Sequence, residues 1–197
     1  MLLSTAEDLA VFVNELRKET DRGLPLVATA LIDHLLQETL RAFFCETKSV
    51  SYLIDGGNAP LGSFSSRIHA CHALGLIDEF EWREVTLLRK VRNLFAHNKH
   101  GFSFNDETVM GLCSSLESDL PQDEGYPLSN ARFRFINASV CVVLRLYHRP
   151  AWVKLEKRKP REWVSSQQVT WRSVKDDPPP NGSPVMVIGK LSDTPES

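Results

Sequence analysis

The chain has 197 residues, of which 42% are hydrophobic and 24% charged, a composition typical of one folded domain with an appendage. Its net charge of -2 argues against a protein that coats nucleic acid through bulk positive charge. Because no apolar run approaches the ~20 residues of a membrane span and the N-terminus lacks a signal-peptide core, we expect a soluble cytoplasmic protein without a membrane partner.

Residues 1–150 show helical periodicity interrupted by clear stops, and the pattern predicts an all-α bundle. Capping patterns at Ser4-x-x-Glu7 and Asp78-x-x-Glu81 mark two of the helix starts, and Gly23 and Gly75 mark two ends. The six predicted helices cover residues 4–23, 25–44, 63–75, 78–97, 103–116 and 129–149.

Residues 151–197 differ in composition and are predicted to form a separate C-terminal extension. They carry 8 basic and 6 acidic side chains, whereas residues 1–150 carry 15 and 19. The basic run 154–161 lies between Trp152 and Trp163, an arrangement that can bind nucleic acid weakly or simply be solvated. Residues 168–174 and 184–188 look extended, so a small β-hairpin and disorder are both open.

The segment Arg92-Asn93-Leu94-Phe95-Ala96-His97 joins two complementary chemical groups. A guanidinium can clamp a phosphate with two hydrogen bonds, and an imidazole can transfer a proton near neutral pH. Arg92 and His97 are five residues apart and so differ by about 140° around a helix. They converge only if Arg92 curls round the helix, or if two copies pack this helix across a twofold and share a composite site. Alternatively, Arg92 pairs with Glu84 or Asp78, and His97 caps the end of the helix.

Four blocks of the sequence have the order and spacing of a known family. Arg92, Asn93 and His97 match the Arg-polar-x-x-x-His motif of the HEPN superfamily, whose members are all-α nucleases and nucleotide-binding modules. Across residues 25–148 the chain more closely resembles the mannitol operon repressor family, a HEPN-like group. The resembling blocks are residues 55–68, 74–77, 92–97 and 102–107.

The resemblance implies two functions of different class. The first is a transcriptional regulator of a sugar-alcohol operon. The second, known from nuclease HEPN proteins, is a metal-independent endoribonuclease in which the 2′-hydroxyl attacks the adjacent phosphate. Carried onto this chain, His97 would transfer the proton, Arg92 would stabilise the phosphate and Asn93 would orient them.

Direct reading of DNA is not supported by a clear helix-turn-helix. Across Cys71–Val85, Gly75 can serve as the turn, but Glu81 falls where that motif needs a buried Ile or Val. We therefore expect a non-enzymatic regulator that acts through protein contacts. Leu87 and Leu94 lie beside the apolar stripe of helix 78–97, which predicts a homodimer with Arg92 near the twofold.

A second candidate site is the loop Gly56–Gly62 and the helix start that follows it. Backbone amides at Gly57, Asn58, Gly62 and Ser63, with Arg67 behind them, can hold a phosphate. No Gly-Lys-Ser/Thr follows, which excludes a P-loop. A purely structural turn is the other interpretation.

The histidines and cysteines do not form a recognisable metal-binding or cofactor-binding motif, so we expect neither a bound metal nor a cofactor. His69/His72 and His97/His100 are spaced like pairs of metal ligands, but no third ligand is apparent. His34 is predicted to lie partly buried among leucines. The four cysteines are predicted to be reduced thiols, mostly buried: Cys45, Cys71, Cys113 and Cys141.

Overall fold

The structure is a computed structural model that describes residues 6–97, 102–118, 127, 129–160, 170–173 and 185–188. The chain divides into two compact units, Met1–Lys159 and Pro160–Ser197. The helix Arg149–Leu155, which the sequence analysis did not predict, packs against Gly23–Phe43 and Ala131–Tyr147 within the first unit. The predicted division at residue 150 stays a prediction.

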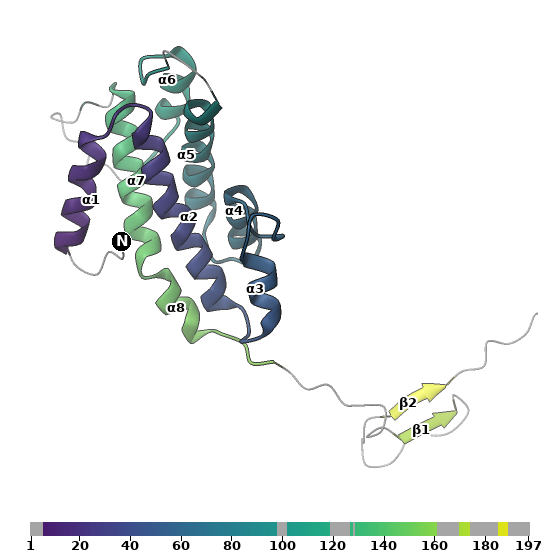
Figure 1. The fold of residues 1–197 in the computed structure, drawn as a ribbon. Coiled ribbons are helices and arrows are strands. Elements are labelled where there is room, and N and C mark those ends of the chain that lie inside the picture. Colours follow the sequence, from purple (N-terminus) through teal and green to yellow (C-terminus); the bar gives the residue numbers. More distant parts are fainter. Residues whose placement is uncertain are drawn as a thin grey trace, which may run out of the picture. The chain divides into compact units, whose positions relative to one another are not determined.

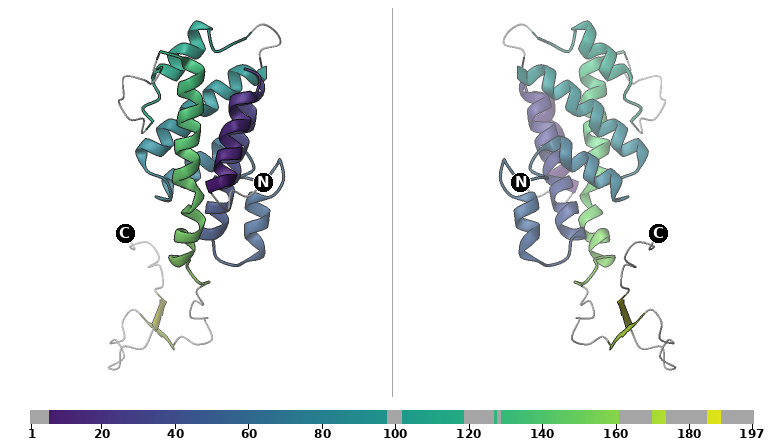
Figure 2. Two further views of the ribbon diagram at one scale, coloured as in Figure 1. Left: turned by 90° about the vertical axis from the view of Figure 1, so that its left-hand side faces the viewer. Right: turned by 90° about the vertical axis from the view of Figure 1, so that its right-hand side faces the viewer.

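The described part of the first unit is all-α, as predicted (Figure 1). The long helices α2, α5 and α7 pack against one another, α4 covers α2 and α5, and α6 covers α5 and α7. Side views show α1 beside one half of α7, and α8 continuing the course of α7 at the other end (Figure 2). The helices are α1 (Ala6–Lys18), α2 (Gly23–Phe43), α3 (Lys48–Ile54), α4 (Phe64–Ala73), α5 (Glu79–His97), α6 (Glu107–Ser114), α7 (Ala131–Tyr147) and α8 (Arg149–Leu155).

Local hydrogen bonds explain where the best-predicted helices begin. At the start of α5 the Glu81 amide donates to Asp78 Oδ1 over 2.7 Å, and the Asp78 amide donates to Glu81 Oε2 over 3.0 Å. Ser63 and Ser66 form the equivalent reciprocal box at α4. Each box satisfies amides that have no partner within the helix, which confirms both predicted starts.

Other boundaries differ from the prediction. Gly23 begins α2 instead of ending α1; a glycine stops a helix by adopting a positive φ, and Gly75 does so at +69° whereas Gly23 does not. α7 ends before Pro150, as predicted, but Pro150 then lies in the first turn of a further helix, α8, because that turn needs no donor from it. The short helix α3 buries only Ile54, so its sequence carries no periodic signal.

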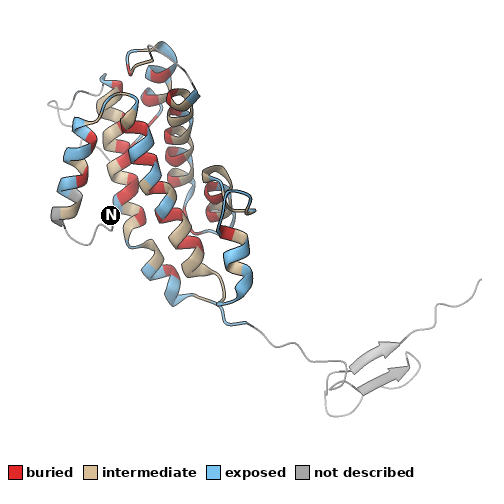
Figure 3. Cartoon of the chain, in the orientation of Figure 1, coloured by how far each residue is buried: buried red, intermediate tan, exposed pale blue. Residues whose placement is uncertain are grey.

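The core is a single cluster of apolar side chains, and every described helix of the first unit contributes at least one buried residue to it; the buried residue of α3 is Ile54 (Figure 3). The predicted stripe of α5 is confirmed: Val85, Leu88, Val91 and Phe95 are buried. Leu87 and Leu94 are themselves half-buried against the core. Cys71 and Cys113 are buried free thiols whose pKa values burial raises to about 12, which keeps them protonated and unreactive.

Arginines of α7 donate hydrogen bonds to carbonyl groups at the ends of earlier helices. Arg132 donates to the Glu19 carbonyl beyond α1, and its Nη1 lies 2.7 Å from Asp21 Oδ1. Arg134 Nε donates to the Cys113 carbonyl in the last turn of α6 over 2.8 Å. These guanidiniums supply donors to carbonyls that helix ends leave unpaired, so they stabilise the bundle.

The second unit contains two described strands, β1 (Thr170–Ser173) and β2 (Val185–Ile188). They fall within the two segments predicted to be extended. They pair in parallel, with Thr170 opposite Val185, so the predicted hairpin is wrong: a hairpin would pair them antiparallel. The alternative of disorder concerns residues outside those described.

Candidate functional site

The predicted Arg–His motif forms the last two turns of α5. Arg92 and Asn93 are half-buried, and His97, the last residue of the helix, is exposed. Arg92 Nη1 donates to Asn93 Oδ1 over 3.1 Å. Within the described residues no hydrogen bond joins Arg92 to His97, in keeping with their separation around the helix. His100 lies outside the described residues.

The carboxylates proposed as alternative partners of Arg92 are engaged elsewhere. Asp78 caps α5, and Glu84 accepts the amides of Glu117 and Ser118 over 2.8 and 3.3 Å. The expectation of an Arg92 pair with Glu84 or Asp78 is therefore wrong. Arg92 instead donates to the side chain of its own neighbour, and the catalytic roles of Arg92, Asn93 and His97 stay a prediction.

Two glutamates of α5 are buried, and sequence reasoning missed their roles. Glu81 has no exposed surface and lies 2.6 Å from Arg149 Nη2 of α8. Glu84 is 1% exposed, and burial raises its pKa above the ordinary value of 4.5, although the two backbone amides oppose that shift. Their burial could have been predicted, because Glu81 and Glu84 share a helix face with the apolar residues Val85 and Leu88. A carboxylate buried on such a face needs a cation or hydrogen-bond donors.

The Gly56–Gly62 loop is built as a tight turn against α2. Gly56 adopts a positive φ of +92°, and a Cβ on Gly62 would lie 2.4 Å from the Gly56 carbonyl oxygen. Arg67 Nε donates to the Leu61 carbonyl over 2.9 Å, and its Nη1 lies 2.8 Å from Asp33 Oδ1.

These contacts occupy the Arg67 guanidinium, which a phosphate site in this loop would need. The Arg67 side chain is buried and already has two protein acceptors, whereas Gly57 and Asn58 are exposed at the loop and Ser63 caps α4. A phosphate site at Gly57, Asn58, Gly62, Ser63 and Arg67 stays a prediction. The structural interpretation accounts for every contact described in this loop.

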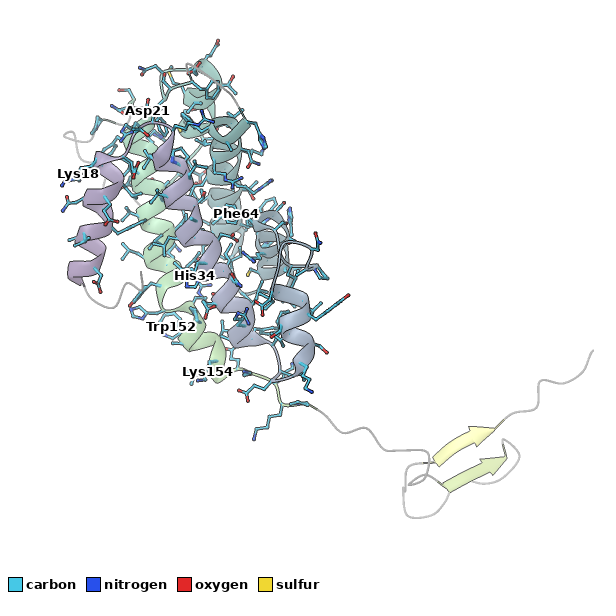
Figure 4. All side chains as sticks on the ribbon, viewed as in Figure 1. Lys18, Asp21, His34, Phe64, Trp152 and Lys154 are labelled. Carbon is cyan, nitrogen blue, oxygen red and sulfur yellow. The ribbon has the colours of Figure 1, made fainter. Side chains whose placement is uncertain are left out.

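The histidines of α4 contact Trp82 rather than one another. His72 stacks on the Trp82 ring at 5.1 Å and lies 3.1 Å from a Glu79 carboxylate oxygen, and Trp82 Nε1 donates to His69 Nδ1 at 3.5 Å. In the parts of the chain that the structure covers, no three ligand side chains gather as a metal site would require. His34 is exposed on α2, so its predicted burial is wrong (Figure 4).

The segment that most resembles a helix-turn-helix packs into the bundle through its second helix. Its second helix would be α5, which packs against α2, α4, α6 and α7. Glu81 occupies the position where a helix-turn-helix places an apolar residue; it is buried there, but as the ion-pair partner of Arg149. Glu79, whose side chain is 74% exposed in the first turn of α5, adds a negative charge that would repel DNA phosphates.

Comparisons with known proteins agree with the resemblance seen in the sequence. A family model described as "Mannitol repressor" matches residues 13–126, more than half of the chain. The chain belongs to the mannitol repressor family. The match includes the Gly56–Gly62 loop and the Arg92–His97 motif and ends before α7.

Mannitol operon repressors from two strains of Escherichia coli, K12 and CFT073, are each 25% identical to this chain over 122 residues. That alignment covers 57% of this chain and 63% of the length of each relative. An X-ray structure of the MtlR–HPr complex from Escherichia coli is similar over 74% of this chain and 98% of that one, with 22% identity and a TM-score of 0.49. The wider HEPN-like resemblance stays a prediction.

Proposed function

We propose that this mannitol repressor family protein is a cytoplasmic transcriptional regulator that acts through protein contacts instead of reading DNA directly. The family match supports regulation of a sugar-alcohol operon. One structural observation supports the indirect route: α5, the helix that the sequence nominates for the major groove, packs against α2, α4, α6 and α7, and Glu81 in its first turn is buried in the ion pair with Arg149. A recognition helix must instead present its first turns to the bases.

Two measurements test the proposal. Expressed in a host that lacks its own family member, the chain should repress a mannitol-operon reporter. The purified protein should give no sequence-specific footprint on the same control region at physiological salt. A nanomolar footprint would restore direct DNA reading, and an unaffected reporter would remove the regulatory function itself.

The protein partner is best sought with defined candidates. HPr, present in the solved MtlR complex from Escherichia coli, is the first protein to test by titration calorimetry with the full chain. Because basic residues gather near the end of the helical unit, we also expect weak binding to nucleic acid. The affinity should fall steeply with added salt.

A homodimer with Arg92 near the twofold remains part of the proposal. Its sequence basis was the second apolar face of α5, but Leu87 and Leu94 are half-buried within one chain. Less apolar surface is therefore left for a twofold on α5 than the sequence indicated. Light scattering at high micromolar concentration decides between monomer and dimer.

The endoribonuclease alternative receives no support. Arg92 binds Asn93, and His97 lies on a different side of the same helix end. The comparisons name repressors. We expect no metal-free cleavage of single-stranded RNA, assayed by gel electrophoresis of a labelled oligonucleotide.

A further inference from the structure

An exposed apolar stripe runs along the end of α7 and the length of α8. Its members are Leu144, 51% exposed, His148, Trp152, 67% exposed, and Leu155, 86% exposed. The Trp152 amide donates to the carbonyl of His148, the residue that caps α8, over 3.2 Å, so His148 belongs to the helical register of α8. In that register His148, Trp152 and Leu155 lie within an arc of about 60°, and Leu144 lies four residues before His148 in the last turn of α7.

The stripe is held outward by contacts on the opposite side of the same helices. Leu146 and Val153 are buried in the core. Arg149 donates to the Leu76 carbonyl and to Glu81, both over 2.6 Å, which fixes the rotation of α8. The exposed face is therefore a preorganised surface, of the kind that lowers the entropic cost of binding.

Nothing in the described helical unit covers this stripe. α1 packs beside the first half of α7, where Val13 and Arg17 line a cavity of about 420 Å³ with Phe133, Ile136 and Val140. The stripe begins beyond these residues. Trp152 and Lys154 extend from α8 in Figure 4, and the outer side of α8 is coloured as exposed in Figure 3.

The charge beside the stripe is positive. Lys154, Arg158 and Lys159 are exposed in α8 and the residues that follow it, whereas Glu156 is the exposed acid of residues 149–160. Lys157 lies 3.1 Å from Glu46 and is already paired. Residues 1–150 carry an excess of acid, so this end is distinct from the rest of the helical unit.

We infer that the α7–α8 stripe, defined by Leu144, His148, Trp152 and Leu155, binds an amphipathic helix of a partner protein whose apolar face is flanked by carboxylates. Exposed tryptophan and leucine on a rigid helix supply the apolar contact, and the neighbouring cations select an acidic partner. A second copy docked on the same stripe would bring the two sets of cations together. Duplex DNA would leave the apolar side chains without a complement.

The inference rests on the proposed function, because it names the kind of protein contact through which the regulator would act. The probe is a fluorescein-labelled 18-residue helical peptide with leucines on one face and glutamates on both flanks. Its twin carries lysines in place of the glutamates. Fluorescence anisotropy measures the binding of each peptide to the full chain.

The wild-type chain should bind the acidic peptide at least tenfold more tightly than the basic one. Trp152→Ala should weaken that binding at least tenfold, and the combined reversal Lys154→Glu, Arg158→Glu, Lys159→Glu should invert the preference. Tyr52→Ala is the matched control, because Tyr52 is 79% exposed on α3 and should leave binding unchanged. If Trp152→Ala does not fold, Leu155→Glu at a largely exposed position replaces it.

Equal affinity for both peptides, or no effect of Trp152→Ala, would overturn the inference. So would Trp152-dependent binding to phosphatidylglycerol vesicles or to oligo(dT) without binding to either peptide, which would make the stripe a membrane or nucleic-acid surface. The mannitol-operon reporter distinguishes a failure of this inference from a failure of the proposed function. Repression by both the wild type and Trp152→Ala removes the inference and leaves the proposed function, whereas no repression by the wild type removes the proposed function.

Discussion

Arg149→Ala should be strongly destabilising, because it leaves a fully buried carboxylate without its cation. Glu81 has no exposed surface, and without Arg149 Nη2 at 2.6 Å its Oε1 loses a charge-assisted hydrogen bond. Oε2 keeps only the Asp78 amide. The Leu76 carbonyl loses its bond to Nη1 as well.

Breaking a buried ion pair by removing one partner costs about 3–5 kcal/mol. The Arg149 side chain is 22% exposed, so water can partly replace it, and we expect a loss near the low end, about 3 kcal/mol. That is a large share of the ~5–15 kcal/mol by which a domain is stable. Urea unfolding followed by circular dichroism measures it.

Arg83→Ala is the matched control. Arg83 lies 2.8 Å from Glu117, but both side chains are 53% exposed, and an exposed pair contributes only about 0–1 kcal/mol. Adding Glu81→Gln to the Arg149 variant should recover part of the loss by removing the buried charge. The reasoning is refuted if Arg149→Ala costs no more than Arg83→Ala.

Two further predictions concern the loop and the second buried glutamate. Gly62→Ala should lower the melting temperature, because its Cβ would meet the Gly56 carbonyl at 2.4 Å, whereas Gly57→Ala, with open space around it, should not; equal melting temperatures would contradict this. Because burial raises the pKa of Glu84 above 4.5, its stabilising contribution is present at low pH and lost as the pH rises through the folded-state pKa. The stability advantage of wild type over Glu84→Gln in thermal melts should therefore be greatest below pH 4.5 and shrink as the pH rises above it, and a constant or growing advantage would contradict the assignment.

Features set by neighbours a few residues apart could be predicted from the sequence. The Asp78–Glu81 box and the Ser63 cap depend on groups three residues apart, and the Val85–Phe95 stripe on helical spacing. Gly23 shows the limit of this reasoning. A glycine can end a helix or simply begin one, and only its φ distinguishes the two.

Features set by distant partners could not be predicted. Glu81 meets Arg149 across 68 residues, and Glu84 meets the Glu117 amide across 33. No spacing rule links such groups, so the sequence nominates Glu84 only as a partner of Arg92. The Arg92–His97 motif was found because it is contiguous, but the contact between Arg92 and Asn93 required coordinates.

The arginine contacts of α7 and α8 also constrain the order in which the chain can fold. Arg132 binds the Glu19 carbonyl from 113 residues further along, so the end of α1 is closed only after α7 exists. At about 5–20 residues per second, the end of α1 emerges roughly 6–23 s before this partner is synthesised. During that interval the apolar faces that α7 and α8 later cover are open to chaperones and to other nascent chains. The region matched by the family model, residues 13–126, ends before α7, so expressed alone it should collapse without reaching a fixed native packing.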